Sequence, residues 1–308
     1  MILIHHKTKQ FLVQLIKILV VIGAFYFIYN ELINNDKLNW HQFLIIFKKN
    51  QSFSGLLIIF FLSFLNRFFE IIKWQNLVSF LKPISVFEST KQVLAALTLG
   101  VFTPVGVGEY AGKALYFNKS KTSEIIFLNL ICNGIQMIIT TFFGLLGMFF
   151  LGYYLWALGI MFIGIIVILF FVLIKNKKIR GYNIQDFIKK INSISIKIHK
   201  KNLFLGLSRY LVFTHQYYFL LIAFDVNVNY FNLISTITMI YFLSSVVPSF
   251  QFLDFALKGS LAIYFFKILG VNEWIVIFIT SLMWFLNVAV PVIIGSFFVL
   301  NFKLQSSE

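Results

Sequence analysis

The chain has 308 residues, of which 59% are hydrophobic and only 12% are charged, and its mean hydropathy is +0.87. A soluble domain of this composition would have too little polar surface, so an ordinary soluble enzyme or binding module is excluded. The formal net charge of +15 raises the question of nucleic-acid binding. However, most Lys and Arg residues lie in short segments beside apolar runs, as in the cytoplasmic loops of membrane proteins. We therefore expect an all-α, polytopic membrane protein that binds no nucleic acid.

Six apolar runs are close to or longer than the roughly 20 residues that cross a bilayer core. They are residues 11–29, 53–72, 124–150, 153–174, 203–224 and 273–300. The first run contains Lys17 and no small-residue cleavage site follows it, so we expect a retained helix rather than a signal peptide. The sequence predicts a single transmembrane domain over residues 1–308 with six full spans.

Two connecting segments have helical, interfacial patterns. Residues 40–49 carry Trp and Phe at helical spacing, and residues 184–198 carry Ile and Phe in the same way. The second segment lies within 175–201, which holds nine Lys or Arg residues against the single acid Asp186. This charge places the segment in the cytoplasm, where it either sets the topology or also binds an anionic leaflet.

A short apolar stretch, residues 93–102, is too short to span a membrane by itself. Pro104, Gly106 and Gly108 follow it, and these residues break a helix. A second half-helix is expected to begin near Glu109, so the two halves form a re-entrant hairpin. Such a backbone is tolerated only where protein or water covers it.

The hairpin has basic flanks, which predicts entry from the cytoplasm. Lys73 and Lys82 precede it, and Lys119 and Lys121 follow it. Near the break, Glu109 and Lys113 lie four residues apart on one helical face. The pair is either a surface ion pair in a loop or, as we expect, part of a water-accessible cavity near the bilayer midplane.

The same features recur in the second half of the chain at a nearly constant offset. The offsets are 144 from Pro104 to Pro248, 145 from Glu109 to Asp254, 145 from Lys113 to Lys258 and 142 from Arg67 to Arg209. A constant offset indicates an internal duplication, which many transporters use to build a midplane site. We predict repeat one over residues 11–150 and repeat two over residues 153–300.

Each repeat then has three spans and one broken helix pair. Because three is odd, the two repeats have opposite orientations. The termini and the 175–201 segment are predicted to be cytoplasmic, with Gly152 and Asp225 outside. In the alternative, residues 86–103 and 231–247 are full spans, which gives eight crossings and parallel repeats.

Arg67 and Arg209 are arginines in or beside apolar runs. An intramembrane Arg costs about 2.5–3.5 kcal/mol on insertion scales, so a partner or water is expected. Arg67 either pairs with Glu70 or lies at the head-group level beside Lys73 and Trp74. Arg209 lies deeper in its run and His215 deeper still.

Cations, glycine-rich breaks and helix N-termini together favour an anionic head group as ligand. The candidate lipid-binding residues are Arg67, Thr103, Gly106, Gly108, Glu109, Lys113, Arg209, His215, Asp254 and Lys258. Alternatively, the acid–lysine pairs only neutralise each other and lock the hairpins. The single cysteine, Cys132, excludes a cysteine-based metal site, and no Walker-type loop or serine nucleophile motif occurs. We predict no catalytic set, no metal and no cofactor, and an enzyme is the less favoured class.

Three motifs stand out, namely Thr103-Pro104-x-Gly106-x-Gly108-Glu109-x3-Lys113, Arg67 with Lys73-Trp74, and Leu269-Gly270-Val271. Together they resemble the transmembrane region of bacterial lysylphosphatidylglycerol synthases, a family often described as flippase-like. The resemblance covers nearly the whole chain and implies a multi-pass protein of the bacterial cytoplasmic (inner) membrane. It carries over Thr103, Pro104, Gly106, Gly108 and Glu109 as motif residues.

The chain departs from this family pattern at several positions. Lys113 stands where Arg is common, and Val105 stands where Gly is common. After Pro248, the usual glycines are replaced over residues 249–252. No soluble aminoacyl-transfer domain is recognisable after Val299, so lipid aminoacylation is not implied.

The resemblance and the charge pattern together predict a function. We expect a flippase-like membrane protein that binds or translocates an anionic or polyprenyl-linked lipid, with membrane lipids as its partners. The alternative is a membrane-embedded enzyme or an assembly subunit of cell-envelope lipid metabolism.

Overall fold

The computed structural model describes residues 53–101, 103, 106–175, 184–247 and 254–302, together with isolated helical positions between residues 15 and 26. The expected interfacial helix at 40–49 lies outside the described residues, and so does most of the expected span 11–29. The regular elements of the described part are helices. In chain order they are α3 (Phe53–Val78), α4 (Val86–Gly100), α5 (Val107–Ala114), η1 (Lys119–Lys121), α6 (Thr122–Phe150), α7 (Tyr154–Leu173), α8 (Ile184–Asn192), α9 (Ile196–Ala223), α10 (Tyr230–Val246), α11 (Asp254–Ile268), α12 (Glu273–Trp284), η2 (Phe285–Ala289) and α13 (Val290–Leu300). The predicted all-α class is confirmed.

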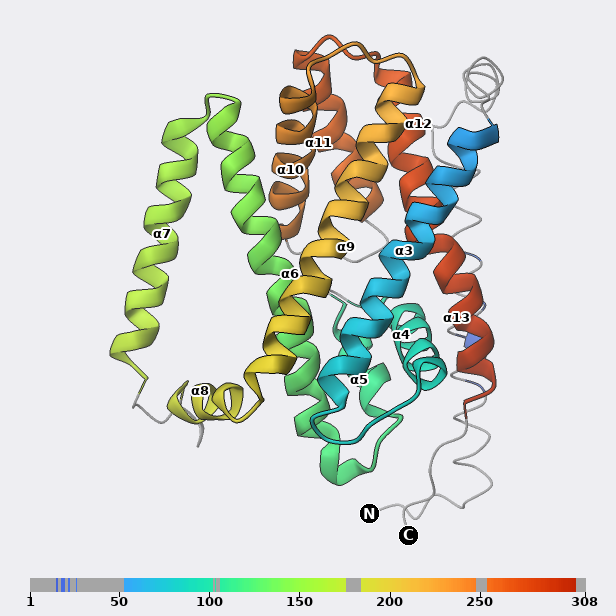
Figure 1. Ribbon diagram of the computed structural model, residues 1–308, viewed down its shortest axis with the longest axis vertical. Coiled ribbons are helices and arrows are strands. Elements are labelled where there is room, and N and C mark those ends of the chain that lie inside the picture. The colour runs from blue at the N-terminus through green and yellow to red at the C-terminus, as the bar shows by residue number, and fades with distance from the viewer. Residues whose placement is uncertain are drawn as a thin grey trace.

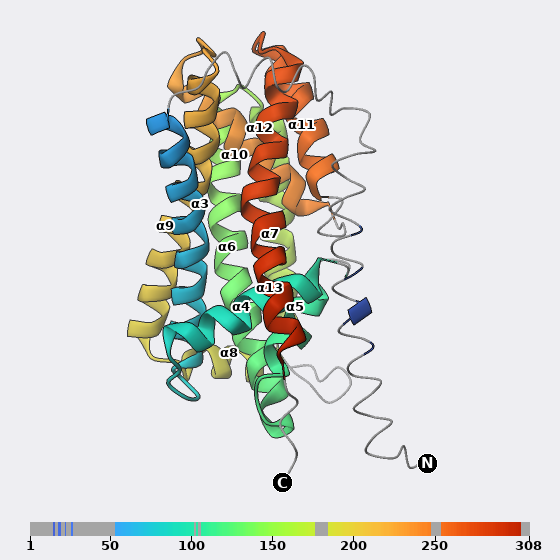
Figure 2. The same ribbon diagram turned by 90° about the vertical axis from the view of Figure 1, so that its right-hand side faces the viewer.

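The long helices run along the long axis of a bundle, and the short helices fill its two halves (Figure 1). In both views α4 and α5 lie in the lower half, whereas α10 and α11 lie in the upper half (Figure 2). In the described part of the chain, three helical stretches are long and apolar enough to cross a membrane by length and composition. They are Lys119–Phe150, Tyr154–Leu173 and Glu273–Leu300.

α3 and α9 extend beyond the apolar runs that predicted them. α3 continues to Val78 instead of ending at residue 72, and α9 begins at Ile196 instead of residue 203. In the added part of α3, Lys73 is 1% exposed and Trp74 is fully buried. The expectation that Lys73 is a basic flank at the surface is therefore wrong, because neighbouring helices cover this end of α3.

The amphipathic segment predicted at 184–198 is divided between two helices. α8 ends at Asn192, and Ile198 belongs to the first turn of α9, which Ser195 caps. Between them, Ile194 is buried in a cluster with Trp74 and Ile125. A polar cap residue in the middle of the apolar pattern thus ends one helix and starts the next.

In the core, helices of the first half of the chain pack against helices of the second half. α3 packs along α9, and the two run in opposite directions (Figure 1). α4 packs against α13, where Thr98 Oγ1 donates to the carbonyl of Val292 at 3.2 Å. In the same manner α10 packs against α6, with Met148 and Phe242 in one buried cluster. The first hairpin (α4 and α5) therefore packs on α13, and the second hairpin (α10 and α11) packs on α6.

The two ends of the bundle differ in charge. The turn after α3 and the helices η1 and α8 lie at the lower end, together with the last turn of α13 (Figure 1). Described cations there include Lys82, Lys119, Lys121, Lys189 and Lys190. The turns at Gly152 and Asp225 lie at the opposite end, near Lys267 and Glu273. Where the structure describes them, the segments predicted to be cytoplasmic thus share one end, and those predicted to be outside share the other (Figure 1).

Candidate functional site

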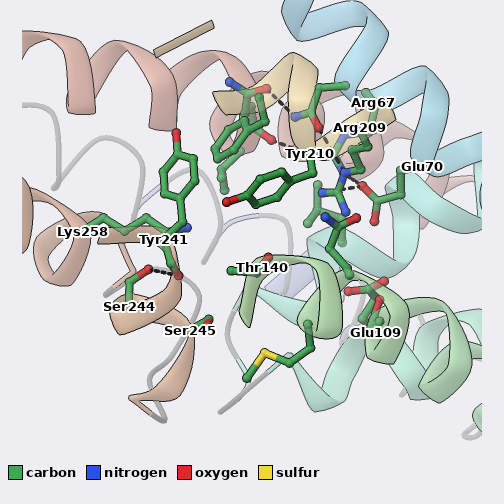
Figure 3. A pocket seen from close by; sticks show the side chains of 18 of the residues that line it. Arg67, Glu70, Glu109, Thr140, Arg209, Tyr210, Tyr241, Ser244, Ser245 and Lys258 are labelled. Atoms are coloured by element: carbon green, nitrogen blue, oxygen red, sulfur yellow. Dashed lines mark hydrogen bonds and ion pairs between the residues drawn. The ribbon is translucent and has the colours of Figure 1, made fainter. Parts of the chain in front are cut away.

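A cavity of about 560 Å³ lies between the first hairpin (α4 and α5), the second hairpin (α10 and α11), the long helices α3, α6 and α9, and η2 (Figure 3). Its polar lining is extensive for a site between apolar helices. The polar lining residues are Asn66, Arg67, Glu70, Glu109, Asn133, Gln136, Thr140, Arg209, Tyr210, Tyr241, Ser244, Ser245, Lys258 and Asn287. Of the ten candidate residues, four line this one cavity, namely Arg67, Glu109, Arg209 and Lys258.

One carboxylate holds both arginines of the cavity. Glu70 Oε2 accepts from Arg67 Nη1 at 2.6 Å and lies 3.2 Å from Arg209 Nη2. The side chains of Arg67, Glu70 and Arg209 are 13%, 9% and 23% exposed, so all three are largely shielded from solvent. Because one carboxylate neutralises only one guanidinium, this triad retains one positive charge. Arg67 therefore has the Glu70 partner that was expected for an arginine inside the bundle.

A chain of amide side chains orients the guanidinium of Arg209. Arg209 Nε donates to Asn66 Oδ1 at 3.1 Å, and Asn66 Nδ2 donates to Asn287 Oδ1 at 2.7 Å. Asn287 Nδ2 in turn donates to Gln216 Oε1 at 3.1 Å. The chain of bonds joins α3, α9 and η2, and a satisfied buried network of this kind favours one geometry.

The acceptor for the second nitrogen of Arg67 is created by a proline. Pro291 has no N–H, so the carbonyl of Asn287, four residues earlier, lacks its usual intrahelical donor. The backbone widens into the π-helix η2 just before this proline. Arg67 Nη2 donates to this carbonyl at 2.5 Å. A local irregularity of the last long helix therefore becomes part of the site.

The break between α4 and α5 is built by its threonine and glycines. Gly106 adopts a left-handed conformation, with φ of 67°, at the start of α5. Thr103 Oγ1 donates to the carbonyl of Gly100 at 2.8 Å and accepts from the N–H of Gly108 at 2.7 Å. A Cβ at Gly108 would collide with the carbonyl of Leu99. The predicted helix break is confirmed, although Pro104 itself lies outside the described residues. Thr103, Gly106 and Gly108 shape the hairpin rather than line the cavity.

Glu109 and Lys113 form a buried pair behind this break. Their charged atoms lie 2.7 Å apart, and Lys113 Nζ also donates to Asn129 Oδ1 at 2.7 Å. Lys113 is fully buried, and its Nζ lies 4.6 Å from the ring centroid of Trp74. The surface-loop alternative is therefore wrong. Glu109 lines the cavity as expected, but Lys113 lies behind the wall.

Lys73 is a further buried cation close to the cavity, which the sequence interpretation placed at the surface. Lys73 Nζ lies 3.4 Å from Gln136 Oε1, and Gln136 lines the cavity. Lys73 and Lys113 are both near enough to Glu70 to interact with it electrostatically. Arg67, Lys73, Lys113 and Arg209 thus carry four formal positive charges against the two negative charges of Glu70 and Glu109, a formal excess of +2.

The remaining predicted residues lie on the second hairpin and on α9. Lys258 of α11 lines the cavity on the side away from Arg67 (Figure 3). Asp254 is the first residue of α11, but the position of its side chain lies outside what the structure describes. His215 lies away from the cavity, where its Nε2 is 2.9 Å from Tyr230 Oη and links α9 to α10.

A stripe of polar residues on α6 was missed in the sequence. Asn129, Asn133, Gln136 and Thr140 are spaced at i, i+4, i+7 and i+11, which puts them on one helical face. The last three line the cavity, and Asn129 binds Lys113. Polar residues at helical spacing within a run otherwise as apolar as 124–150 were the signal that identifies this face.

Within the described residues, no group of three or more His, Cys, Asp or Glu side chains could hold a metal ion. Comparisons with protein-family models, with curated proteins and with solved structures found no match.

Proposed function

We propose that this protein is a multi-pass protein of the bacterial inner membrane that binds an anionic lipid head group in the cavity and translocates the lipid across the bilayer. The observation that carries the proposal is the excess positive charge of the cavity wall. Arg67, Arg209 and Lys258 face the cavity with Glu70 and Glu109, and buried Lys73 and Lys113 lie behind them. An uncompensated cation inside a bundle is costly unless an anion or water accompanies it.

Translocation rather than simple binding is favoured by the relation between the two halves. α3 and α9 pack in opposite directions, and the two hairpins occupy opposite halves of the bundle (Figures 1 and 2). This arrangement supports the proposal of two inverted repeats with re-entrant hairpins, which can expose a midplane site alternately to the two sides. The basic lower end supports a cytoplasmic location for that end.

The size and lining of the cavity suit a head group rather than a whole lipid. A volume of about 560 Å³ is in the range of sites for small molecules. Exposed apolar residues such as Leu155, Trp156 and Phe162 on α7, which packs on α6 outside the cavity, provide a surface that acyl chains can cover. The resemblance to the flippase-like family points to the same class of substrate.

Reconstitution in liposomes tests this proposal. A fluorescent phosphatidylglycerol in the inner leaflet should become accessible to a membrane-impermeant quencher faster with the protein than without it, and the same label on phosphatidylcholine should not. Lys258→Met should slow this movement about tenfold or more. Lys267→Met provides the matched control on the same helix, because Lys267 is 72% exposed and pairs with Glu273.

Two results contradict the proposal. Equal rates for both lipids, or an unchanged rate in Lys258→Met, would show that the cavity does not select an anion. A chemically modified lipid in the mass spectrum of the extracted membranes would instead identify the protein as a membrane-embedded enzyme.

A further inference from the structure

Lys73 and Lys113 are both buried lysines, but their surroundings differ sharply. Lys113 has a carboxylate and an amide oxygen at 2.7 Å and an aromatic ring beneath its ammonium group. Lys73 is 1% exposed, and its polar neighbour is Gln136 Oε1 at 3.4 Å. Among the described residues no carboxylate lies within ion-pair distance of Lys73 Nζ. A lysine buried in this way carries its charge only when an anion compensates it.

The charged and titratable groups around Lys73 do not supply one. Glu70, one turn earlier on α3, is already shared by two guanidiniums. The other groups that interact with Lys73 are Arg209 on α9, Lys113 on α5 and the thiol of Cys132 on α6. The two cations oppose a further positive charge, and the thiol is buried.

The charges of α4, which also packs on α3, are engaged elsewhere. Glu88 accepts from the N–H of Ser85 in a capping box at the start of the helix. Lys91 lies over the ring of Phe87. α4 therefore brings no counter-ion to Lys73 either.

We propose that the cavity takes up its anion together with one proton, and that Lys73 carries this proton. The inference rests on the anion site of the proposed function. Lys73 is separated from the cavity by Gln136, which touches both, so an anion in the cavity would lie on the far side of this amide. The negative charge supplies at long range the compensation that the neighbouring residues lack.

The charge of the site before and after binding shows why one proton should accompany one anion. Protonation of Lys73 adds one positive charge to the groups around the cavity, and a bound monoanion adds one negative charge. Anion and proton together thus leave the charge of the site unchanged. Their joint movement across a bilayer is electroneutral, so a pH gradient drives it and a membrane potential does not.

Binding measurements on the purified full chain in a zwitterionic detergent test the coupling. The probe is a short-chain phosphatidylglycerol, because a phosphodiester stays a monoanion where a phosphate monoester titrates near pH 6. For the wild type, binding should tighten as the pH falls, by up to about tenfold per pH unit. Calorimetry in two buffers of different ionisation enthalpy should show uptake of about one proton per lipid bound.

Two substitutions at Lys73 should remove this pH dependence in opposite ways. Lys73→Met carries no proton, so its affinity should stay at the high-pH limit of the wild type at every pH. Lys73→Arg is charged throughout, so its affinity should stay at the low-pH limit. Lys119→Met, which removes an exposed lysine of η1, is the control and should retain the wild-type dependence.

The outcomes separate the two proposals. A wild type that binds the lipid without proton uptake overturns the coupling and leaves the anion site standing, and so does a Lys73→Met variant that keeps the wild-type pH slope. A wild type that binds no phosphatidylglycerol at any pH overturns the anion site and the coupling together.

Discussion

Replacing Glu70 with Gln removes the carboxylate that contacts both arginines of the cavity while keeping the shape of the side chain. The change leaves Arg67 and Arg209, which are 13% and 23% exposed, without their shared counter-ion. A hydrogen bond to a charged group contributes about 1.5–3 kcal/mol, and breaking a buried pair costs about 3–5 kcal/mol. Partial exposure of the guanidiniums and the remaining amide oxygen reduce this cost. We expect Glu70→Gln to lose about 2–4 kcal/mol of stability.

The melting temperature of the purified protein in detergent measures this loss. At about 2–4 °C per kcal/mol, the expected decrease is about 5–15 °C. Glu124→Gln is the matched control, since Glu124 also pairs at i,i+3 spacing, with Lys121 at 3.2 Å, but its side chain is 34% exposed. Such a surface pair contributes about 0–1 kcal/mol, so the control should shift by a few degrees at most.

An anionic lipid provides a second measurement on the same variant. Glu70→Gln makes the cavity more positive by one charge, so short-chain phosphatidylglycerol should restore part of the lost melting temperature. A Glu70→Gln protein that melts like the Glu124→Gln control would refute the reasoning. The two arginines would then be solvated well enough to need no counter-ion, and the charge excess of the cavity would not favour an anionic ligand.

Gly108→Ala should destabilise the protein by several degrees because its Cβ meets a carbonyl of α4, whereas Gly134→Ala, with open space around its Cβ, should be neutral or slightly stabilising in the same melting assay. Cysteines introduced at Lys82 and Asp225 should react with an impermeant maleimide from opposite sides of the membrane, and labelling of both from one side would contradict the inverted topology. Native Cys132, which is 1% exposed, should stay unlabelled in the folded protein and react after denaturation.

The local parts of the site could be predicted from the sequence. Proline and glycine act on the backbone where they stand, so the break before Glu109 is visible without tertiary information. The offset of 142 between Arg67 and Arg209 also suggested that the two arginines belong together. In the structure their guanidiniums meet on Glu70, from two neighbouring helices.

The burial of Lys73 could not be predicted in this way. A hydropathy pattern ends a span where charges begin, and Lys73 follows the apolar run that ends at residue 72. Whether such a lysine faces lipid head groups or a neighbouring helix depends on the packing of α6 against α3, which involves residues such as Gln136 far along the chain. The acceptor at Asn287 was hidden for a similar reason, since Pro291 frees the carbonyl but its donor, Arg67, comes from α3, 220 residues earlier in the chain.

The packing of α4 on α13, from opposite ends of the chain, has a consequence for the synthesis of the protein. Thr98 on α4 has a second acceptor in the carbonyl of Val292, 194 residues later in the chain. At a synthesis rate of about 5–20 residues per second, α4 waits roughly 10–40 s for α13. During that time the hydroxyl of Thr98 bonds to the carbonyl of Leu94 in its own helix, whereas the face of α4 that packs on α13 has no permanent neighbour. Biogenesis thus includes an interval in which a membrane chaperone or a temporary helix contact can cover the face that α13 finally takes.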